Sequence, residues 1–148
     1  MITAGLTNSF KEQLLLGVHD FSADVMKIAL YTSAAELGPA TTEYSSANEV
    51  SSPGYSAGGQ VLLNVTVNLS NGIAYVSFDN PTWYATTFAP RGALIYNSTP
   101  SANSNANTTL TNAAVAVLDF GSDKTASAGT FTIIFPTADA SNAIIRIA

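Results

Sequence analysis

A regular alternation of apolar and polar residues over residues 61–69 is the pattern that most constrains the fold. Val or Leu occupies every odd position there, and Asn64, Thr66 and Asn68 occupy even positions, which predicts a strand buried on one face. Asn71-Gly72 follows, and residues 73–78 are apolar again. Asn-Gly between two such runs is the strongest short-range signal for a β-hairpin, so the sequence predicts a hairpin here.

Further short apolar runs predict more strands. They lie at residues 25–31, 91–97, 113–120, 130–135 and 143–147, with a possible additional strand at residues 82–87. Residues 113–120 are apolar on both faces, which is typical of a central strand. We expect an all-β fold, an antiparallel sandwich of seven to eight strands that is jelly-roll or immunoglobulin-like. A chain of 148 residues fits one domain, 1–148, with an N-terminal arm and short helix at 1–24 and the sandwich at 25–148.

One short helix is predicted near the N-terminus. Ser9 and Glu12 form a capping box, Phe10, Leu14 and Leu15 recur at helical spacing, and Gly17 provides a stop. A helix over residues 10–16 is too short to be stable alone in water. Its apolar face must therefore pack against its own sheet or against another subunit.

Two long loops separate the predicted strands. The first, residues 32–60, contains Tyr44, Val50 and Tyr55, which indicates that it docks on the rest of the chain. The second, residues 98–112, is a repetitive Ser, Thr, Asn and Ala stretch with Leu110 as its one apolar anchor. Loops of this length are uncommon in compact domains unless they are functional or mobile.

The composition excludes several classes of protein. Charged residues make up 10% of the chain and the net charge is −5, so the sequence offers no basic surface for nucleic acid. Ser, Thr and Asn supply 45 of the 148 residues, and cysteine is absent, which excludes disulfides and cysteine zinc sites. No apolar run reaches the length of a membrane span, and the first residues lack a secretory signal pattern, so we expect synthesis in a cytoplasm.

Residues with catalytic potential lack the partners that catalysis needs. His19 stands beside Asp20, but no G-x-S-x-G motif provides a nucleophile for a Ser-His-Asp set. Asp119-Phe120-Gly121 spells a kinase triplet without the companion motifs, and Asp119 with Asp123 is a sparse ligand set for calcium. The ten carboxylates mostly fall near turns, where solvated acids are expected, rather than in an evident glycosidase pair. We therefore predict no enzyme activity, catalytic residue, cofactor or metal.

The aromatic residues on irregular segments admit several interpretations. Trp83, Tyr84 and Phe88 lie between Asp79 and Pro90, while Tyr44 and Tyr55 lie in the first long loop. They could anchor an interface, stack on sugars, or close the open end of the sandwich, and the sequence favours none of these.

Several stretches along nearly the whole chain resemble small structural proteins of tailed bacteriophages. These stretches are residues 8–12 (NSFKE), 17–21 (GVHDF), 27–32 (KIALYT), 55–59 (YSAGG), 91–97 (RGALIYN), 120–124 (FGSDK) and 139–146 (DASNAIIR). The resemblance implies a virion protein, made in the bacterial host cytoplasm, that decorates the capsid surface. It also implies the major capsid protein as partner and a homo-oligomer, with a trimer favoured.

A decoration role needs apolar anchors more than charge. The sequence hypothesis is that Ile2, Leu6, Phe10 and the aromatics Tyr44, Tyr55, Trp83, Tyr84 and Phe88 contact the shell or a sister subunit. The alternatives are a tail, neck or fibre-base component, and a carbohydrate-binding module that uses the loop aromatics. No nucleic-acid or membrane partner is expected.

Overall fold

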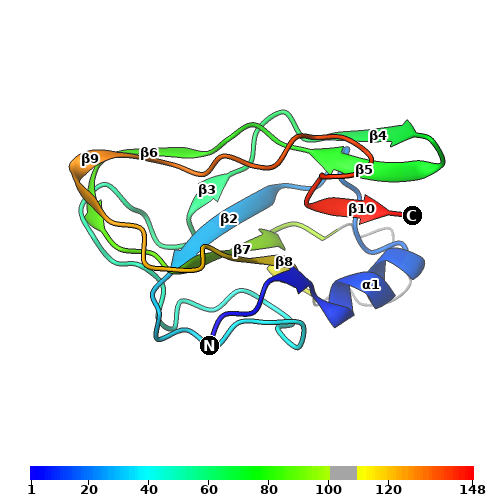
Figure 1. The fold of residues 1–148 in the computed structure, drawn as a ribbon. Helices are drawn as coiled ribbons and strands as arrows, with labels where there is room; N and C mark the ends of the chain where they lie inside the picture. The colour runs from blue at the N-terminus through cyan, green and yellow to red at the C-terminus, as the bar shows by residue number, and fades with distance from the viewer. Residues whose placement is uncertain (101–109) are drawn as a thin grey trace.

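The computed structural model describes residues 1–100 and 110–148 and confirms an all-β fold of antiparallel strands in two layers (Figure 1). Residues 101–109, the centre of the predicted loop at 98–112, lie outside the described residues. The lower layer in Figure 1 is a five-stranded sheet. Its strands, in spatial order, are β1 (Gly5–Leu6), β8 (Ala113–Asp119), β7 (Gly92–Asn97), β2 (Met26–Tyr31) and β3 (Gln60–Val61).

The upper layer consists of two smaller sheets placed end to end (Figure 1). One has the order β10 (Ile145–Ile147), β5 (Ile73–Ser77), β4 (Thr66–Ser70), and the other pairs β6 (Thr82–Phe88) with β9 (Ala126–Thr132). The β5–β6 segment therefore runs antiparallel to the β9–β10 segment, and the Ile133 amide donates to the Pro81 carbonyl oxygen between the two ladders, at 3.0 Å.

The five-stranded sheet is buried on both faces. Ile28, Leu30 and Ile95 face the upper layer and join the larger core, while Ala29 and Leu94 face the opposite way, into a second apolar cluster. Residues 32–59 contribute to this second cluster through Ala35, Leu37 and Tyr44. Strand β8 is an interior strand with a nearly continuous buried run, as predicted from residues 113–120.

The prediction of one strand over residues 61–69 is wrong. Asn64 has a left-handed backbone (φ 51°), which divides the segment into β3 and β4. Leu62 is buried, whereas Leu63, Val67 and Leu69 are exposed, so much of the predicted apolar face is accessible to solvent, although Val65 packs against the core and Val67 lies opposite the buried Val76. The predicted Asn-Gly hairpin is confirmed, because Asn71 (φ 52°) and Gly72 (φ 77°) supply the two positive φ angles of a two-residue turn between β4 and β5.

The helix begins earlier than predicted. Helix α1 spans Asn8–Leu15, and its N-cap is Thr7 rather than Ser9: the Phe10 amide donates to the Thr7 hydroxyl at 3.3 Å. Thr7 is also bound to strand β8, because its hydroxyl donates to the Ala114 carbonyl oxygen at 3.0 Å. Phe10 is fully buried, but Leu15 is 91% exposed, so α1 packs on its own sheet through one side only.

Candidate docking surface

Four of the predicted interface residues are buried inside the chain itself. Ile2, Phe10, Trp83 and Phe88 all belong to the core, and Trp83 is only 3% exposed. Their burial leaves these four side chains little free surface on this protomer to offer a partner. It equally leaves Trp83 unable to stack on a sugar. Trp83 and Phe88 instead belong to the larger core, where both rings lie beside Phe131.

The N-terminal residues lie along the chain's own sheet. Gly5 and Leu6 pair with β8, and the Thr3 amide donates to the Leu37 carbonyl oxygen at 2.8 Å. Leu6 is half-buried and packs against the larger core. The first six residues therefore cover the β8 edge of this molecule.

Tyr44 and Tyr55 hold the long loop through Glu49. The Tyr55 hydroxyl and the Gly58 amide donate to Glu49 Oε1 at 2.5 and 2.8 Å, and the Tyr44 hydroxyl donates to Oε2 at 2.6 Å. Burial, and then the hydrogen bond to Glu49, raise the pKa of both hydroxyls. Tyr44 also stacks on Tyr96, whose hydroxyl donates to the Gly58 carbonyl oxygen. The predicted docking of residues 32–60 is thus confirmed, with Glu49 at its centre.

An open apolar groove of about 560 Å³ lies between the end of β8 and the segment after β9. Its walls are mostly aromatic and aliphatic: Leu118, Phe120, Phe131, Ile133, Ile134, Phe135, Pro136 and Ile144. Ile134 is 78% exposed at this groove, although the alternation in residues 130–135 gave it no role. The groove is open and mostly apolar, and it suits an apolar polypeptide segment.

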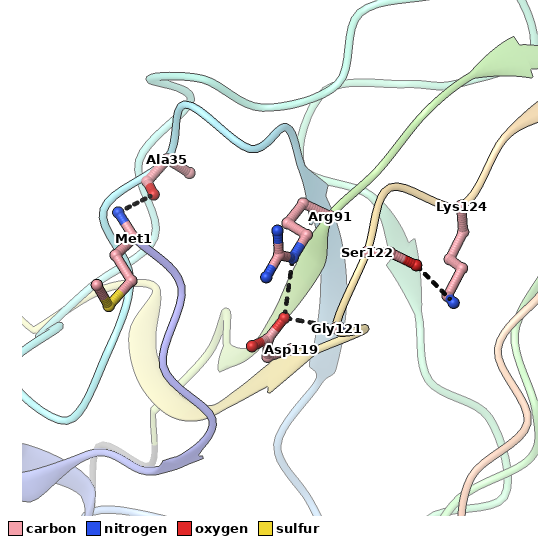
Figure 2. Close-up of polar contacts among 7 residues, drawn as sticks. All are labelled: Met1, Ala35, Arg91, Asp119, Gly121, Ser122 and Lys124. Atoms are coloured by element: carbon pink, nitrogen blue, oxygen red, sulfur yellow. Dashed lines mark hydrogen bonds and ion pairs between the residues drawn. The ribbon is translucent and has the colours of Figure 1, made fainter.

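Polar side chains at one end of the groove are fixed by hydrogen bonds (Figure 2). Asp119 Oδ1 accepts from the Gly121 amide at 2.9 Å and from Arg91 Nε at 3.1 Å, and these bonds lower the pKa of the Asp119 carboxyl. Figure 2 also shows Lys124, whose ammonium donates to Ser122 at 2.9 Å. Asp119 is therefore engaged in a turn and an ion pair of its own.

His19 is held by amides rather than by a nucleophile. His19 Nε2 lies 2.7 Å from Gln13 Oε1, and its Nδ1 lies 3.0 Å from Asn97 Nδ2. The Asn97 amide nitrogen can only donate, so His19 Nδ1 accepts and Nε2 carries the proton that is donated to Gln13 Oε1. Burial lowers the pKa of His19 to about 4, against the opposing effect of Asp24. These contacts join α1, the following turn and the end of β7.

Residues 1–100 and 110–148 contain neither a cluster of metal ligands nor a helix that could span a membrane. No three His, Asp or Glu residues gather there in a way that could hold a metal ion. None of the helical structure there is long and apolar enough to cross a membrane.

Comparison of this chain with protein-family models, with curated protein sequences and with solved structures found no match.

Sequence reasoning missed the residues that are most available to a partner. Leu69 (75% exposed) and Ile134 (78%) lie in runs whose alternation predicts burial of one face, and Leu15 lies on the predicted apolar face of the helix. Of the predicted interface residues, Tyr84 is the one with a largely exposed side chain, at 70%. Asn64 itself is the sequence signal that could have revealed the break before β4, since Asn adopts the positive φ angle found there (51°) more readily than most residues.

Proposed function

We propose that this chain is a structural virion protein that binds the outside of a tailed-phage capsid and stabilises the shell. The observation that carries the proposal is the apolar groove between β8 and residues 131–136, which offers a partner polypeptide an aromatic surface. The resemblance of the sequence to small phage structural proteins supplies the class of partner, the major capsid protein. In this proposal the protein is made in the host cytoplasm and then attaches to the capsid surface.

The chemistry of the groove suits attachment to a preformed shell. Apolar contact with Phe120, Phe131 and Ile144 gains affinity by removing apolar surface from water, at about 25 cal/mol per Å². The low charge of the chain lowers the desolvation cost of packing side by side. A symmetric oligomer, with a trimer favoured, would present several grooves to the lattice at once, and linked sites raise avidity by about 10²–10⁴.

The test is occupancy on empty capsids of the phage that encodes this chain, assembled without it. We expect the unmodified protein to bind in hundreds of copies, and Ile134→Lys to lower occupancy at least tenfold by placing a charge in the groove. Leu15→Lys is the matched control, since it adds the same charge at an exposed apolar residue on α1 and should bind normally.

Two results would overturn the proposal. Equal occupancy of the Ile134→Lys and Leu15→Lys variants would show that the groove does not contact the shell. Localisation of the unmodified protein to the tail or neck, in sixes or twelves, would identify a tail component instead. Cryo-electron microscopy of the particles reports copy number and position in one measurement.

A further inference from the structure

Strand β4 has one edge without a partner strand among the residues that the structure describes. It pairs with β5 on one side, and Figure 1 shows this hairpin extending to one end of the upper layer. Natural edge strands are usually protected from pairing with other chains by charged residues, proline or a bulge. The sequence of β4, Thr-Val-Asn-Leu-Ser, contains neither a charge nor a proline, and its pairing with β5 is regular over all five residues.

The register shows which backbone groups are free. Ser70 and Ile73 flank a two-residue turn, so they exchange both backbone hydrogen bonds, and bonded pairs then alternate along the ladder. Asn68 and Thr66 accordingly direct their backbone groups toward β5. Val67 and Leu69 direct their N–H and C=O groups toward the free edge.

The exposed side chains of β4 continue the apolar face of its sheet. Val67 (58% exposed) lies opposite Val76, and Leu69 (75%) lies opposite Ala74. The same face carries Ile145 and Ile147 of β10 on the far side of β5. The core-facing surface of this sheet therefore extends outward to an edge that has apolar side chains and free hydrogen-bonding groups together.

We propose that β4 pairs antiparallel with β4 of a second copy of this chain, about a two-fold axis beside Asn68. This register places Val67 opposite Leu69 of the second copy, so the two residues with free backbone groups become a bonded pair. Asn68 then faces Asn68 of the second copy in a non-bonded pair, and Thr66 faces Ser70. The two three-stranded sheets become one sheet of six strands.

The strand is suited to its own copy because each of these pairs joins side chains of like kind. A two-fold contact must be self-complementary, and here apolar meets apolar, amide meets amide and hydroxyl meets hydroxyl. Charge supports the same occupant: residues 50–78 contain no Asp, Glu, Lys or Arg, although the chain has a net charge of −5. The β3–β4–β5 region can therefore meet its own copy without opposing like charges.

A contact through one five-residue edge is smaller than the roughly 800 Å² per partner of a standard interface. We therefore expect a dimer that forms as concentration rises, not a permanent one. The contact is separate from a three-fold association, because a trimer formed through other surfaces would leave one β4 edge on each protomer. It does not rest on capsid binding, so either proposal can fail alone.

Cysteine cross-linking tests the register directly, because the chain has no cysteine of its own. In Asn68→Cys, the two introduced thiols would lie in a non-bonded antiparallel pair with Cα atoms about 4.5 Å apart, within the range for a disulfide. Thr66→Cys is the matched control on the same strand and face. In the proposed register its two thiols lie about 13 Å apart along the strands and cannot join.

We expect oxidation of purified Asn68→Cys to give a covalent dimer at least tenfold faster than oxidation of Thr66→Cys. Equal rates would overturn the register, since they would reflect random collision. Sedimentation of the cysteine-free protein from about 10 µM to about 1 mM provides the second measurement. We expect concentration-dependent dimerisation that Leu69→Lys abolishes and Ile134→Lys, a similarly exposed apolar position, preserves. A protein that stays monomeric over this range would refute the pairing.

Discussion

Replacing Glu49 with Gln tests whether one carboxylate fastens the long loop to the sheet. The substitution keeps the shape of the side chain but removes its charge and one of its two acceptor oxygens. In the structure Oε1 accepts two hydrogen bonds, from Tyr55 and Gly58, and Oε2 accepts one from Tyr44. If the Gln carbonyl takes the place of Oε1, two bonds to a charged acceptor become bonds to a neutral one. The Tyr44 hydroxyl must then turn to accept from the new amide.

The magnitude follows from the number of bonds. A hydrogen bond to a charged group contributes about 1.5–3 kcal/mol and a neutral one about 0.5–1.5 kcal/mol, so each of the two bonds weakens by about 1 kcal/mol. We expect Glu49→Gln to lower the free energy of unfolding by about 2 kcal/mol, with a smaller value if water reaches the half-exposed Glu49 side chain.

Urea unfolding measures the global effect, and hydrogen exchange at the Val50 amide measures the local one. Val50 N–H donates to the Leu30 carbonyl oxygen at 2.9 Å and ties the loop to β2. We expect its protection to fall in Glu49→Gln, together with faster proteolysis within residues 32–59. Glu43→Gln is the control, because it makes the same change at an exposed position of the same loop. Equal stability and equal protection in the two variants would refute the assignment of Glu49 as the fastening residue.

Two further predictions concern the joint between α1 and the sheet and the end of the long loop. Burial lowers the folded-state pKa of His19 to about 4, below the ordinary 6.5 of an unfolded chain. The unfolded chain therefore binds the proton first. The stability contributed by neutral His19 is fully present above pH 6.5 and is lost as pH falls toward 4, with a slope below the ~1.4 kcal/mol per pH unit of one proton. The urea unfolding midpoint should fall over this pH range in the unmodified protein, and it should fall less in His19→Gln. The same pH dependence in both proteins would contradict the assignment to His19. Gly59 has φ 73°, and an added Cβ would overlap the Ile28 backbone carbonyl, whereas at Gly121 (φ 76°) the Cβ meets open space. Gly59→Ala should therefore unfold at clearly lower urea than Gly121→Ala, which bears only the ~1–2 kcal/mol cost of the backbone conformation; equal midpoints would show that the loop shifts freely.

The strands that sequence predicted well are those whose signals are local. The runs that became β2, β7 and β8 are nearly continuous apolar segments. The turn between β4 and β5 is specified by Asn71 and Gly72 alone, because both residues adopt positive φ angles readily. Strand β1 was not predicted, because a two-residue pairing with β8 leaves no periodic pattern to detect. The helix cap moved from Ser9 to Thr7 because Thr7 can bond to the Ala114 carbonyl oxygen, a partner 107 residues away that no local motif reveals.

The exposed surfaces were harder to predict than the core. An alternating run shows that two faces differ, but it does not say which face a distant layer will cover. In residues 61–69 Leu62 is buried before the left-handed Asn64, whereas Val67 and Leu69 after it lie on the core side of their sheet but at an edge that stays exposed. The aromatic loop residues were recognised as anchors, but whether an anchor serves the chain itself or a partner depends on the long loop and the strands that surround it. Trp83 and Phe88 pack in the chain's own core.

The two proposed contacts can operate together because they use different residues. In the lower layer β8 lies beside the β1 edge and β3 forms the other edge, while in the upper layer β10 and β4 form opposite edges of one sheet. The groove is built from the ends of β8, β9 and the residue before β10, whereas the self-pairing surface is β4, which contributes no residue to the groove. A protomer held by its groove therefore keeps its β4 edge free. On a lattice the local concentration of copies is high, so a pairing too weak to persist in dilute solution would link neighbouring protomers once each is bound.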